Sequence, residues 1–384
     1  MSDARTVQLL RLAAAISFIF VIVNHLMPPS VFAGSQLLFD YDQGFIRRGL
    51  AGELLGPMLG PTVSVGEIYL AAALITLTAA AILYIFLIRN LGGTVVSFLL
   101  MILVFDSFAF ASFIGTTGYL DGVLLALVLL ALSTNGAGTL GLLLRLAVCV
   151  IGILVHEAML PYFTVLIGFE LWIVRGAGRG AVLPALLPVA VGFMTVAVLS
   201  VIGEHDAAQA QAFLAGLNQR IEYTLPEGIK QVVRLSLTDN FELMRDMRSQ
   251  PRYWNWWKFD GTPLILMSLW LIWLNMKLLG REASILTKIL CLGAITAPFS
   301  LNLIAFDVVR FGVMAVLNGF IVAALLVRHL PGARERLTQV LTWPVFVILL
   351  IINANIFTMQ VNQTENHLSQ FPWIFVKHLE WLQP

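Results

Sequence analysis

Residues 7–50 read VQLLRLAAAISFIFVIVNHLMPPSVFAGSQLLFDYDQGFIRRGL and decide the class of fold. The apolar run that begins this stretch is long enough, at roughly 20 residues, to cross the hydrocarbon core of a bilayer. No small-residue cleavage site follows it, so we interpret the run as a retained membrane span and not as a signal peptide. A polar segment with two aspartates and two arginines comes directly after the span.

The composition of the whole chain agrees with a membrane protein. Of its 384 residues, 59% are hydrophobic and 12% are charged, and the mean hydropathy is +0.88. A soluble domain carries about 25% charged residues, so most of this surface is expected to face lipid or other helices. The net charge of +1 gives no electrostatic footprint for nucleic acid. Cys149 and Cys291 lie in apolar stretches and indicate neither a disulfide framework nor a metal site.

Apolar runs of spanning length predict an all-α, polytopic helix bundle with about eleven transmembrane spans. The run 139–175 is too long for one ordinary helix and contains the polar pair His156-Glu157 near its middle. We therefore predict two short spans that meet at this pair. The other predicted spans are 7–27, 68–88, 94–112, 119–134, 182–203, 262–280, 284–305, 308–328 and 342–360.

Charge asymmetry predicts the orientation of the bundle. Short cytoplasmic loops carry an excess of lysine and arginine, and a cytoplasmic N-terminus gives this pattern only if 139–175 crosses twice. The polar segments 28–67 and 204–260 then lie outside, and 361–384 is expected to be an interfacial tail. We expect a multi-pass protein of a bacterial inner membrane. The basic residues on the predicted cytoplasmic side are Arg5, Arg11, Arg89, Arg145, Arg175, Arg179, Lys277, Arg281, Lys288, Arg328, Arg334 and Arg336.

The same topology brings ionisable residues from distant loops to the outer side. Charged groups near membrane depth are expensive and tend to mark function, so their shared side predicts one site. These residues are Asp40, Asp42, Arg47, Arg48, Asp121, His156, Glu157, Asp307 and Arg310.

The segment FDYDQGFIRRGL, residues 39–50, carries the first part of this predicted site. Asp40 and Asp42 could supply a general base or hold a divalent cation such as Mg²⁺ or Mn²⁺, although no cofactor is certain. Arg47 and Arg48 could bind a phosphate bidentately. Alternatively, the aspartates cap an interfacial helix and the arginines reach out to the lipid headgroups. The rest of the segment, 51–66, is expected to form a short amphipathic helix on the membrane surface.

Two more acids and an arginine lie at the outer ends of later spans. Asp121 begins the fourth predicted span, where it could bind substrate or simply interact favourably with the positive end of the helix dipole. Asp307 and Arg310 are one helical turn apart and share a face. They could bind substrate or form an intrahelical salt bridge.

His156 and Glu157 offer a further candidate for catalysis. The fourth residue after His156 is Leu160, so the zinc-protease motif HExxH is absent. The two side chains could act as a base oriented by a carboxylate, or they could be a buried polar pair that is internally satisfied.

The outer segment 204–260 contains seven basic residues and ends in YWNWWKF, residues 253–259. Arg252 and Trp256 are the residues in it that we expect to bind substrate. Aromatic residues at this depth suit stacking against sugar rings, but an interfacial aromatic belt explains them equally well.

These features resemble the GT-C class of integral-membrane glycosyltransferases. That class carries an acid-bearing outer loop with an interfacial helix after the first span, as FDYDQGFIRRGL does here, and often an acid in a context like YLDGVLLALVLLAL, residues 119–132. The resemblance implies transfer of a sugar from a polyprenyl-linked donor to a glycan or lipid acceptor outside the membrane. This chain lacks the Asp-x-Glu pair and the large soluble C-terminal domain of the class.

The resemblance suggests a mechanism in which Asp42, or Asp40, deprotonates the acceptor, and Arg47, Arg48 and Arg310 neutralise the departing phosphate. The pattern is also similar to polymerases and ligases of the O-antigen type, which join lipid-linked glycans. A transporter or flippase of a lipid-linked glycan stays open because Asp106 lies deep in the third predicted span.

Overall fold

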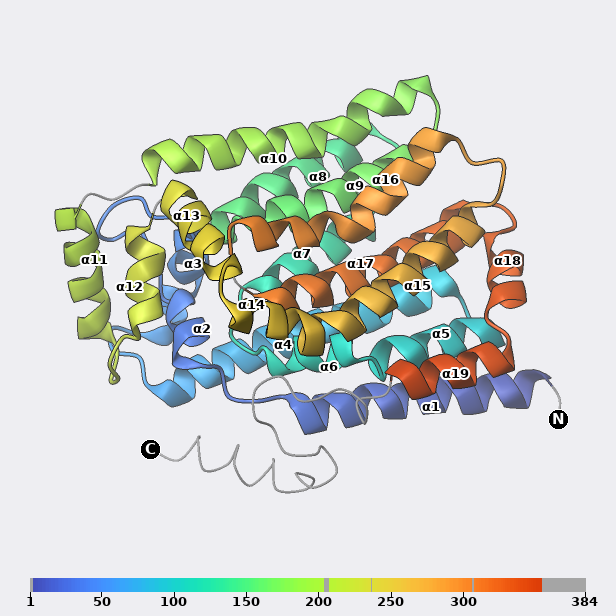
Figure 1. Cartoon of the computed structure of the whole chain (residues 1–384), viewed down its shortest axis with the longest axis horizontal. Coiled ribbons are helices and arrows are strands. Elements are labelled where there is room, and N and C mark those ends of the chain that lie inside the picture. Colours follow the sequence, from blue (N-terminus) through green and yellow to red (C-terminus); the bar gives the residue numbers. More distant parts are fainter. Residues whose placement is uncertain (1–2, 204–206, 236, 306, 354–384) are drawn as a thin grey trace.

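The computed structural model describes residues 3–203, 207–235, 237–305 and 307–353, and shows a bundle whose long helices run roughly along one direction (Figure 1). Regular secondary structure in these residues is helical, apart from an isolated parallel bridge between Val63 and Ile221. The predicted all-α fold is confirmed.

Within the described ranges, six helices are long and apolar enough to cross a membrane. A seventh span is possible if α5 (Val95–Phe105) and α6 (Phe108–Gly115), which meet at a bend of 49°, count as one. All seven fall on predicted spans. The six helices are α1 (Asp3–His25), α4 (Val65–Leu91), α10 (Val182–Ile202) with the short η2 (Arg179–Ala181) before it, α15 (Thr262–Leu279), α16 (Ile285–Thr296) continued by η4 (Ala297–Leu303), and α17 (Val308–His329).

The prediction of about eleven spans is not confirmed, because the remaining apolar helices are short. A helix of 12 residues, such as α7, is about 18 Å long, whereas the hydrocarbon core is about 30 Å thick. The run 139–175 does divide in two at His156, as predicted. The short helices are α7 (Asp121–Leu132), α8 (Thr139–Val155), η1 (Leu160–Thr164) with α9 (Val165–Val174), and α19 (Trp343–Asn353). The predicted span 342–360 is described only as far as α19, and its remainder and the tail 361–384 lie outside the described residues.

Helix α17 forms the centre of the bundle. Of its most apolar stretch 94% is buried, against 11% for α1 and 22% for the segment that contains α10. It packs against α4, α6, α9, α15 and α16. The Asn318 amide of α17 donates hydrogen bonds to the carbonyls of Tyr162 (2.6 Å) and Ala294 (3.0 Å). The helices around α17 turn their other faces outward, where a lipid environment accommodates the exposed apolar side chains.

Two segments distant in sequence form a small second unit at one end of the bundle, which we call the cap (residues 28–64 and 207–235). The backbone N–H of Val63 donates to the carbonyl of Arg220 (2.7 Å), which joins the two segments. The cap comprises α2 (Val31–Gln36), α3 (Gly49–Leu59), α11 (Ala207–Arg220) and α12 (Glu227–Arg234). Ile68 of α4 packs into the apolar core of the cap, which contains Leu38, Phe39, Ile46, Leu59, Val63, Ala210, Phe213, Leu214, Leu217, Ile221, Leu225, Ile229 and Val233.

The segment 51–66 contains a helix, α3, as the sequence predicts, and its place on the membrane surface stays a prediction. Ala51, Gly52 and Leu59 are buried in it, whereas Leu54 and Met58 are 63% and 81% exposed. Figure 1 shows the cap at the left end, with α13 (Leu237–Arg248) nearby, and the N-terminus and α18 (Ala333–Val340) at the right end. Helix α14 (Pro251–Trp256) and η3 (Trp257–Gly261) lead from α13 into α15.

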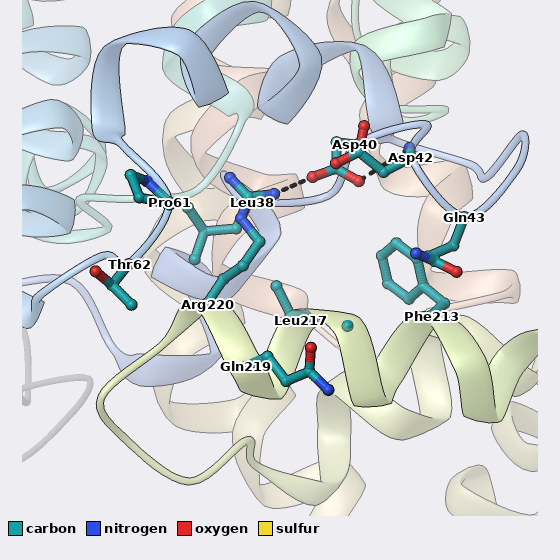
Figure 2. A pocket seen from close by; sticks show the side chains of 11 residues that line it. Leu38, Asp40, Asp42, Gln43, Pro61, Thr62, Phe213, Leu217, Gln219 and Arg220 are labelled. Atoms are coloured by element: carbon teal, nitrogen blue, oxygen red, sulfur yellow. Dashed lines mark hydrogen bonds and ion pairs between the residues drawn. The ribbon is translucent and has the colours of Figure 1, made fainter.

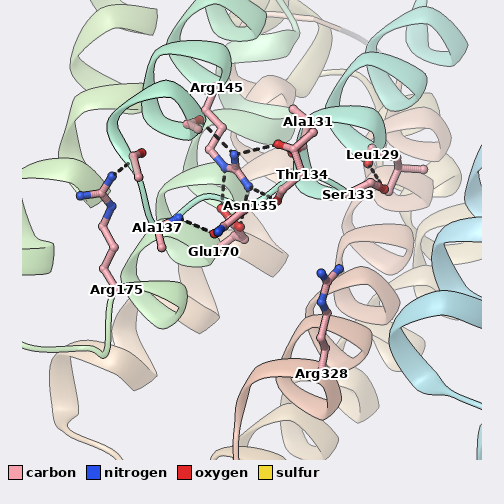
Figure 3. A network of polar contacts seen from close by, with 12 residues as sticks. Leu129, Ala131, Ser133, Thr134, Asn135, Ala137, Arg145, Glu170, Arg175 and Arg328 are labelled. Carbon is pink, nitrogen blue, oxygen red and sulfur yellow. Dashed lines mark hydrogen bonds and ion pairs between the residues drawn. The ribbon is translucent and has the colours of Figure 1, made fainter.

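A buried ion pair connects helices α8 and α9 at the end of the bundle opposite the cap. Arg145 of α8 donates to both carboxylate oxygens of Glu170 in α9, at 2.8 and 2.7 Å, and also donates to Thr134 (Figure 3). The exposed fractions of the two charged side chains are 0% and 1%. The charge pattern of the sequence places Arg145 among the basic residues of cytoplasmic loops, whereas the structure buries it as the link between α8, α9 and the 133–138 turn.

Candidate functional site

Asp40 and Asp42 lie on the loop that joins α2 to α3, at the edge of a pocket in the cap (Figure 2). The pocket has a volume of about 410 Å³ and lies between this loop and α11. Asp40 is buried and forms an ion pair with Arg220 at the end of α11. The pocket is lined by Leu38, Asp40, Asp42, Gln43, Pro61, Thr62, Phe213, Gly216, Leu217, Gln219 and Arg220.

The carboxylate of Asp42 is exposed, unlike that of Asp40. The backbone N–H of Asp42 donates to Asp40 (3.2 Å), which fixes the turn between the two acids. Within the described chain, the Asp42 carboxylate itself forms no hydrogen bond or ion pair. It is therefore available to accept a proton at the pocket edge.

The tandem arginines of the same loop point to different partners. Arg47 donates to the carbonyls of Leu235 (2.6 Å) and Val232 (3.4 Å), and so closes the C-terminal end of α12. Arg48 donates through Nε to both carboxylate oxygens of Glu157 (3.1 and 3.0 Å) and through Nη1 to Gln36 (2.9 Å). Its backbone is left-handed, with φ at +67°, which is uncommon for a residue other than glycine. Arg47 thus links the two segments of the cap, and Arg48 links the cap to the α8–η1 turn.

His156 and Glu157 lie in that turn but do not form the base and carboxylate pair that the sequence suggests. The Nδ1 atom of His156 accepts a hydrogen bond from the backbone N–H of Ala158 (3.0 Å), and its distance to the Glu157 carboxylate is 3.6 Å. An imidazole nitrogen that accepts an N–H carries no proton, so neutral His156 has its proton on Nε2. Glu157 is held by Arg48 instead.

The surroundings fix the charge states of these two residues. Burial, reinforced by the nearby Arg48 guanidinium, lowers the pKa of His156 to about 3. Burial alone would raise the pKa of Glu157, but the charge and hydrogen bonds of Arg48 outweigh it, and the pKa lies below the ordinary value. At neutral pH, His156 is uncharged and Glu157 is a carboxylate.

A pH titration should detect the buried, neutral His156. An unfolded histidine has a pKa of about 6.5. Between this pH and about pH 3, the histidine is protonated in the unfolded chain but stays neutral in the folded protein. The contribution of His156 to the stability of the folded state therefore falls as the pH is lowered through this range. We expect a slope of about 1.4 kcal/mol per pH unit in the free energy of unfolding, and no slope from this residue above pH 7. His156→Gln should remove that part of the slope, and an unchanged slope would contradict the assignment.

Asp121, Asp307 and Arg310 form a second group of charges. Asp121 is the first residue of α7, and Arg310 of α17 donates to both of its oxygens, at 2.8 and 2.9 Å. Asp307 caps α17 by accepting the backbone N–H of Arg310, and its carboxylate lies 3.3 Å from Nη1 of that residue. The Arg310 guanidinium also lies over the ring of Tyr119, 3.8 Å from its centroid. The predicted intrahelical contact exists, but Asp121, 189 residues away in sequence, is the main partner.

The Arg310 contact predicts a specific loss of stability. Arg310→Lys keeps the charge but cannot donate two parallel hydrogen bonds to Asp121, whose side chain is 2% exposed. We expect the free energy of unfolding in mixed micelles to fall by about 2 kcal/mol. Asp307→Asn, at a more exposed carboxylate, should cost less than about 1 kcal/mol. Equal losses in the two variants would show that Asp307, not Asp121, is the main partner.

The groups around Arg48 and Arg310 belong to one cluster. The charges of Asp121 and Arg310 act on His156, and those of Asp121, Arg310, Asp307 and Arg48 act on the hydroxyl of Tyr162. With His156 neutral, three carboxylates and two guanidinium groups give a formal charge of −1. We call this set the charge cluster: Arg48, Asp121, His156, Glu157, Asp307 and Arg310.

A divalent cation held by Asp40 and Asp42 does not fit the residues present. The Asp40 carboxylate is already paired with Arg220. Among the described residues, no group of three or more His, Cys, Asp or Glu side chains lies close enough to hold a metal ion.

Sequence reasoning missed several residues of the site. Arg220 appears in the sequence only as one of seven basic residues in a long outer segment, and nothing there indicates Asp40 as its partner. Gln36, Tyr119 and Tyr162 stand in no recognisable motif either. The predicted substrate residues Arg252 and Trp256 have side chains that lie outside the described part of the structure.

Comparison with known proteins gives one match. No curated protein and no solved structure is similar to the chain. One family model matches residues 6–244, which make up more than half of the chain and include the first span and the whole cap. The chain belongs to the family described as uncharacterised membrane protein Rv1490.

Proposed function

We propose that this membrane protein is a glycosyltransferase that moves a sugar or glycan from a polyprenyl-linked donor to an acceptor on the outer face of the membrane. Cell-envelope or exopolysaccharide synthesis is the setting that this chemistry suits. The observation that carries the proposal is the free carboxylate of Asp42 at the edge of the cap pocket.

The pocket has the size and lining of a small-molecule site. Its volume of about 410 Å³ lies within the usual range of about 300–1,000 Å³ for ligand pockets. The amides of Gln43 and Gln219 can exchange hydrogen bonds with hydroxyl groups. The pocket therefore suits a hydroxyl-bearing acceptor.

In the proposed reaction, Asp42 removes the proton from an acceptor hydroxyl. The acceptor oxygen bonds to the anomeric carbon of the donor sugar while the bond from that carbon to the phosphate oxygen breaks, and the polyprenyl phosphate leaves. Asp40 is unsuited to this role because its carboxylate already accepts a hydrogen bond from Arg220. Its contact orients the loop that carries Asp42.

The arginines require a different role from the phosphate contacts that the sequence suggests. Arg48 and Arg310 donate to carboxylates, and Arg47 donates to backbone carbonyls. A departing phosphate would have to compete with these partners. We therefore propose that all three arginines fix the loops around the site.

The proposed orientation, with the cap facing the periplasm of a bacterial inner membrane, is supported by the basic residues at the opposite end. The ends of α4, α15 and α17 away from the cap carry Arg89, Lys277 and Arg328, and α18 adds Arg334 and Arg336. This is the distribution expected for cytoplasmic loops. Membrane lipids, the lipid-linked donor and a glycan or lipid acceptor are the proposed partners.

A carrier of a lipid-linked glycan is the second candidate, and the α5–α6 bend favours it. Asp106 lies at this break, half-buried within a stretch long enough to span. Ionisable residues at broken helices are typical of transporters. A polymerase or ligase of the O-antigen type would share the glycosyl-transfer chemistry and differ only in its acceptor.

Proteoliposomes separate these functions. The purified chain is reconstituted with a polyprenyl phosphate that carries a radiolabelled sugar and with a mixture of cell-envelope acceptors. Transfer of label from the polyprenyl carrier without movement of the carrier across the bilayer supports the enzyme. Movement of the carrier without a new glycosidic bond refutes the enzyme and supports the carrier.

A further inference from the structure

The charge cluster contains polar groups that its internal contacts leave unused. Tyr162 is 1% exposed, and its hydroxyl, among the charges of the cluster, has no hydrogen-bond partner in the described structure. A buried hydroxyl without a partner is unusual and requires an explanation. The Nε2–H of His156 is a second donor, because Nδ1 is occupied by the Ala158 N–H.

The carboxylates form the accessible part of the cluster. The side chains of Glu157 and Asp307 are 28% and 29% exposed, whereas those of Arg48 and Arg310 are 15% and 11% exposed. The Asp121 carboxylate, whose side chain is 2% exposed, is the most deeply buried of the three. A molecule that approaches the cluster therefore meets acceptor oxygens first.

This arrangement selects the chemistry of a ligand. The guanidinium donors that would bind a phosphate already bind Asp121 and Glu157. Hydroxyl groups suit the cluster well, since they donate to carboxylates and accept from an imidazole or phenol. An uncharged polyol satisfies both kinds of group without introducing a charge.

We propose that the charge cluster binds the hydroxyl groups of an uncharged sugar ring, with Tyr162 and His156 as direct contacts. The inference rests on the proposed function, which it deepens by assigning the sugar, and not the phosphate, to this part of the protein. Arg48 and Arg310 act here by holding the carboxylates in position.

Ligand binding without turnover tests the inference. The full chain in lipid nanodiscs is titrated with the methyl glycosides of glucose, mannose and galactose, and binding is followed by saturation-transfer NMR. At least one glycoside should bind, and inorganic phosphate should not displace it. Tyr162→Phe should weaken that binding by about 3- to 10-fold, the effect of losing one neutral hydrogen bond.

The matched control is Tyr223→Phe, which removes a hydroxyl that contacts Ser35 in the cap (3.0 Å). This variant should bind the glycoside as the unmodified chain does. Because the Tyr162 hydroxyl has no protein partner in the described structure, Tyr162→Phe should unfold at the same temperature as the unmodified chain, so weaker binding is not a folding defect.

Three results would overturn the inference: no glycoside binds, phosphate displaces the glycoside, or Tyr162→Phe binds as the control does. The binding assay contains no lipid-linked donor, so its result can refute this inference without refuting the proposed glycosyltransferase activity. A chain that binds the glycoside but transfers no sugar refutes only the glycosyltransferase. If the chain transfers sugar, but Tyr162→Phe binds the glycoside as tightly as the unmodified chain does, only the assignment of the sugar to the charge cluster is refuted.

Discussion

Replacing Asp42 with asparagine should lower the rate of sugar transfer by about 10²- to 10⁴-fold, the usual contribution of a general base. Asparagine is close to aspartate in size but cannot accept the proton of the acceptor hydroxyl. The exposed Asp42 side chain has no partner in the described chain, so the loop should keep its conformation. The rate is measured with the labelled polyprenyl donor, alongside the unfolding temperature of each variant.

Glu53→Gln is the matched control for this substitution. Glu53 is an exposed acid at the start of α3, and its carboxylate accepts the backbone N–H of Tyr41 (3.2 Å), a hydrogen bond that glutamine can also accept. Its transfer rate should stay within about 2-fold of the unmodified chain. If Asp42→Asn keeps full activity while the control does too, Asp42 is not the base.

Arg145→Met should destabilise the protein more than Arg310→Lys or Asp307→Asn does. It leaves the Glu170 carboxylate, which is 1% exposed, without its guanidinium partner. Breaking one side of a buried ion pair typically costs about 3–5 kcal/mol. The free energy of unfolding in mixed micelles measures the loss.

The double variant Arg145→Met with Glu170→Leu separates the pair from the packing around it. Removing both charges leaves no carboxylate buried alone, and such replacements are often neutral. We expect the double variant to recover most of the stability lost in Arg145→Met. A double variant as unstable as the single one would show that Arg145 contributes through Thr134 and Gly141, to which it also donates, and not through Glu170.

Much of the fold follows from the length and spacing of apolar runs. Runs of spanning length became α1, α4, α10, α15, α16 with η4, and α17, because each buries its backbone hydrogen bonds within one helix. The break at His156 was predictable, since the polar pair His156-Glu157 and then Pro161 interrupt an apolar run there. Helix length was harder to predict for α7, α8 and α9, because these short helices have the apolar composition of a true span.

The functional site stays a prediction, whereas the structure shows which of its proposed residues contact one another. Topology alone indicates that Asp42, the His156 turn and Arg310 lie at the same end of the bundle. Which side chains meet depends on distances set by packing, as in the contact of Arg48 with Glu157 across 109 residues. A tandem arginine therefore suggests a phosphate site in the sequence, whereas in the structure it joins the cap to the bundle.

Labelling from outside the cell tests most directly whether the cap and its pocket face the exterior. Single cysteines replace exposed residues at the two ends of the molecule, Gln43 and Glu53 in the cap and Arg281 and Arg334 at the opposite end. The two native cysteines are buried and should stay unlabelled. A membrane-impermeant maleimide on intact cells should label positions 43 and 53 and leave 281 and 334 unlabelled until the membrane is opened. Labelling of 281 and 334 in intact cells, with none at 43 and 53, would place the pocket in the cytoplasm and contradict transfer on the outer face.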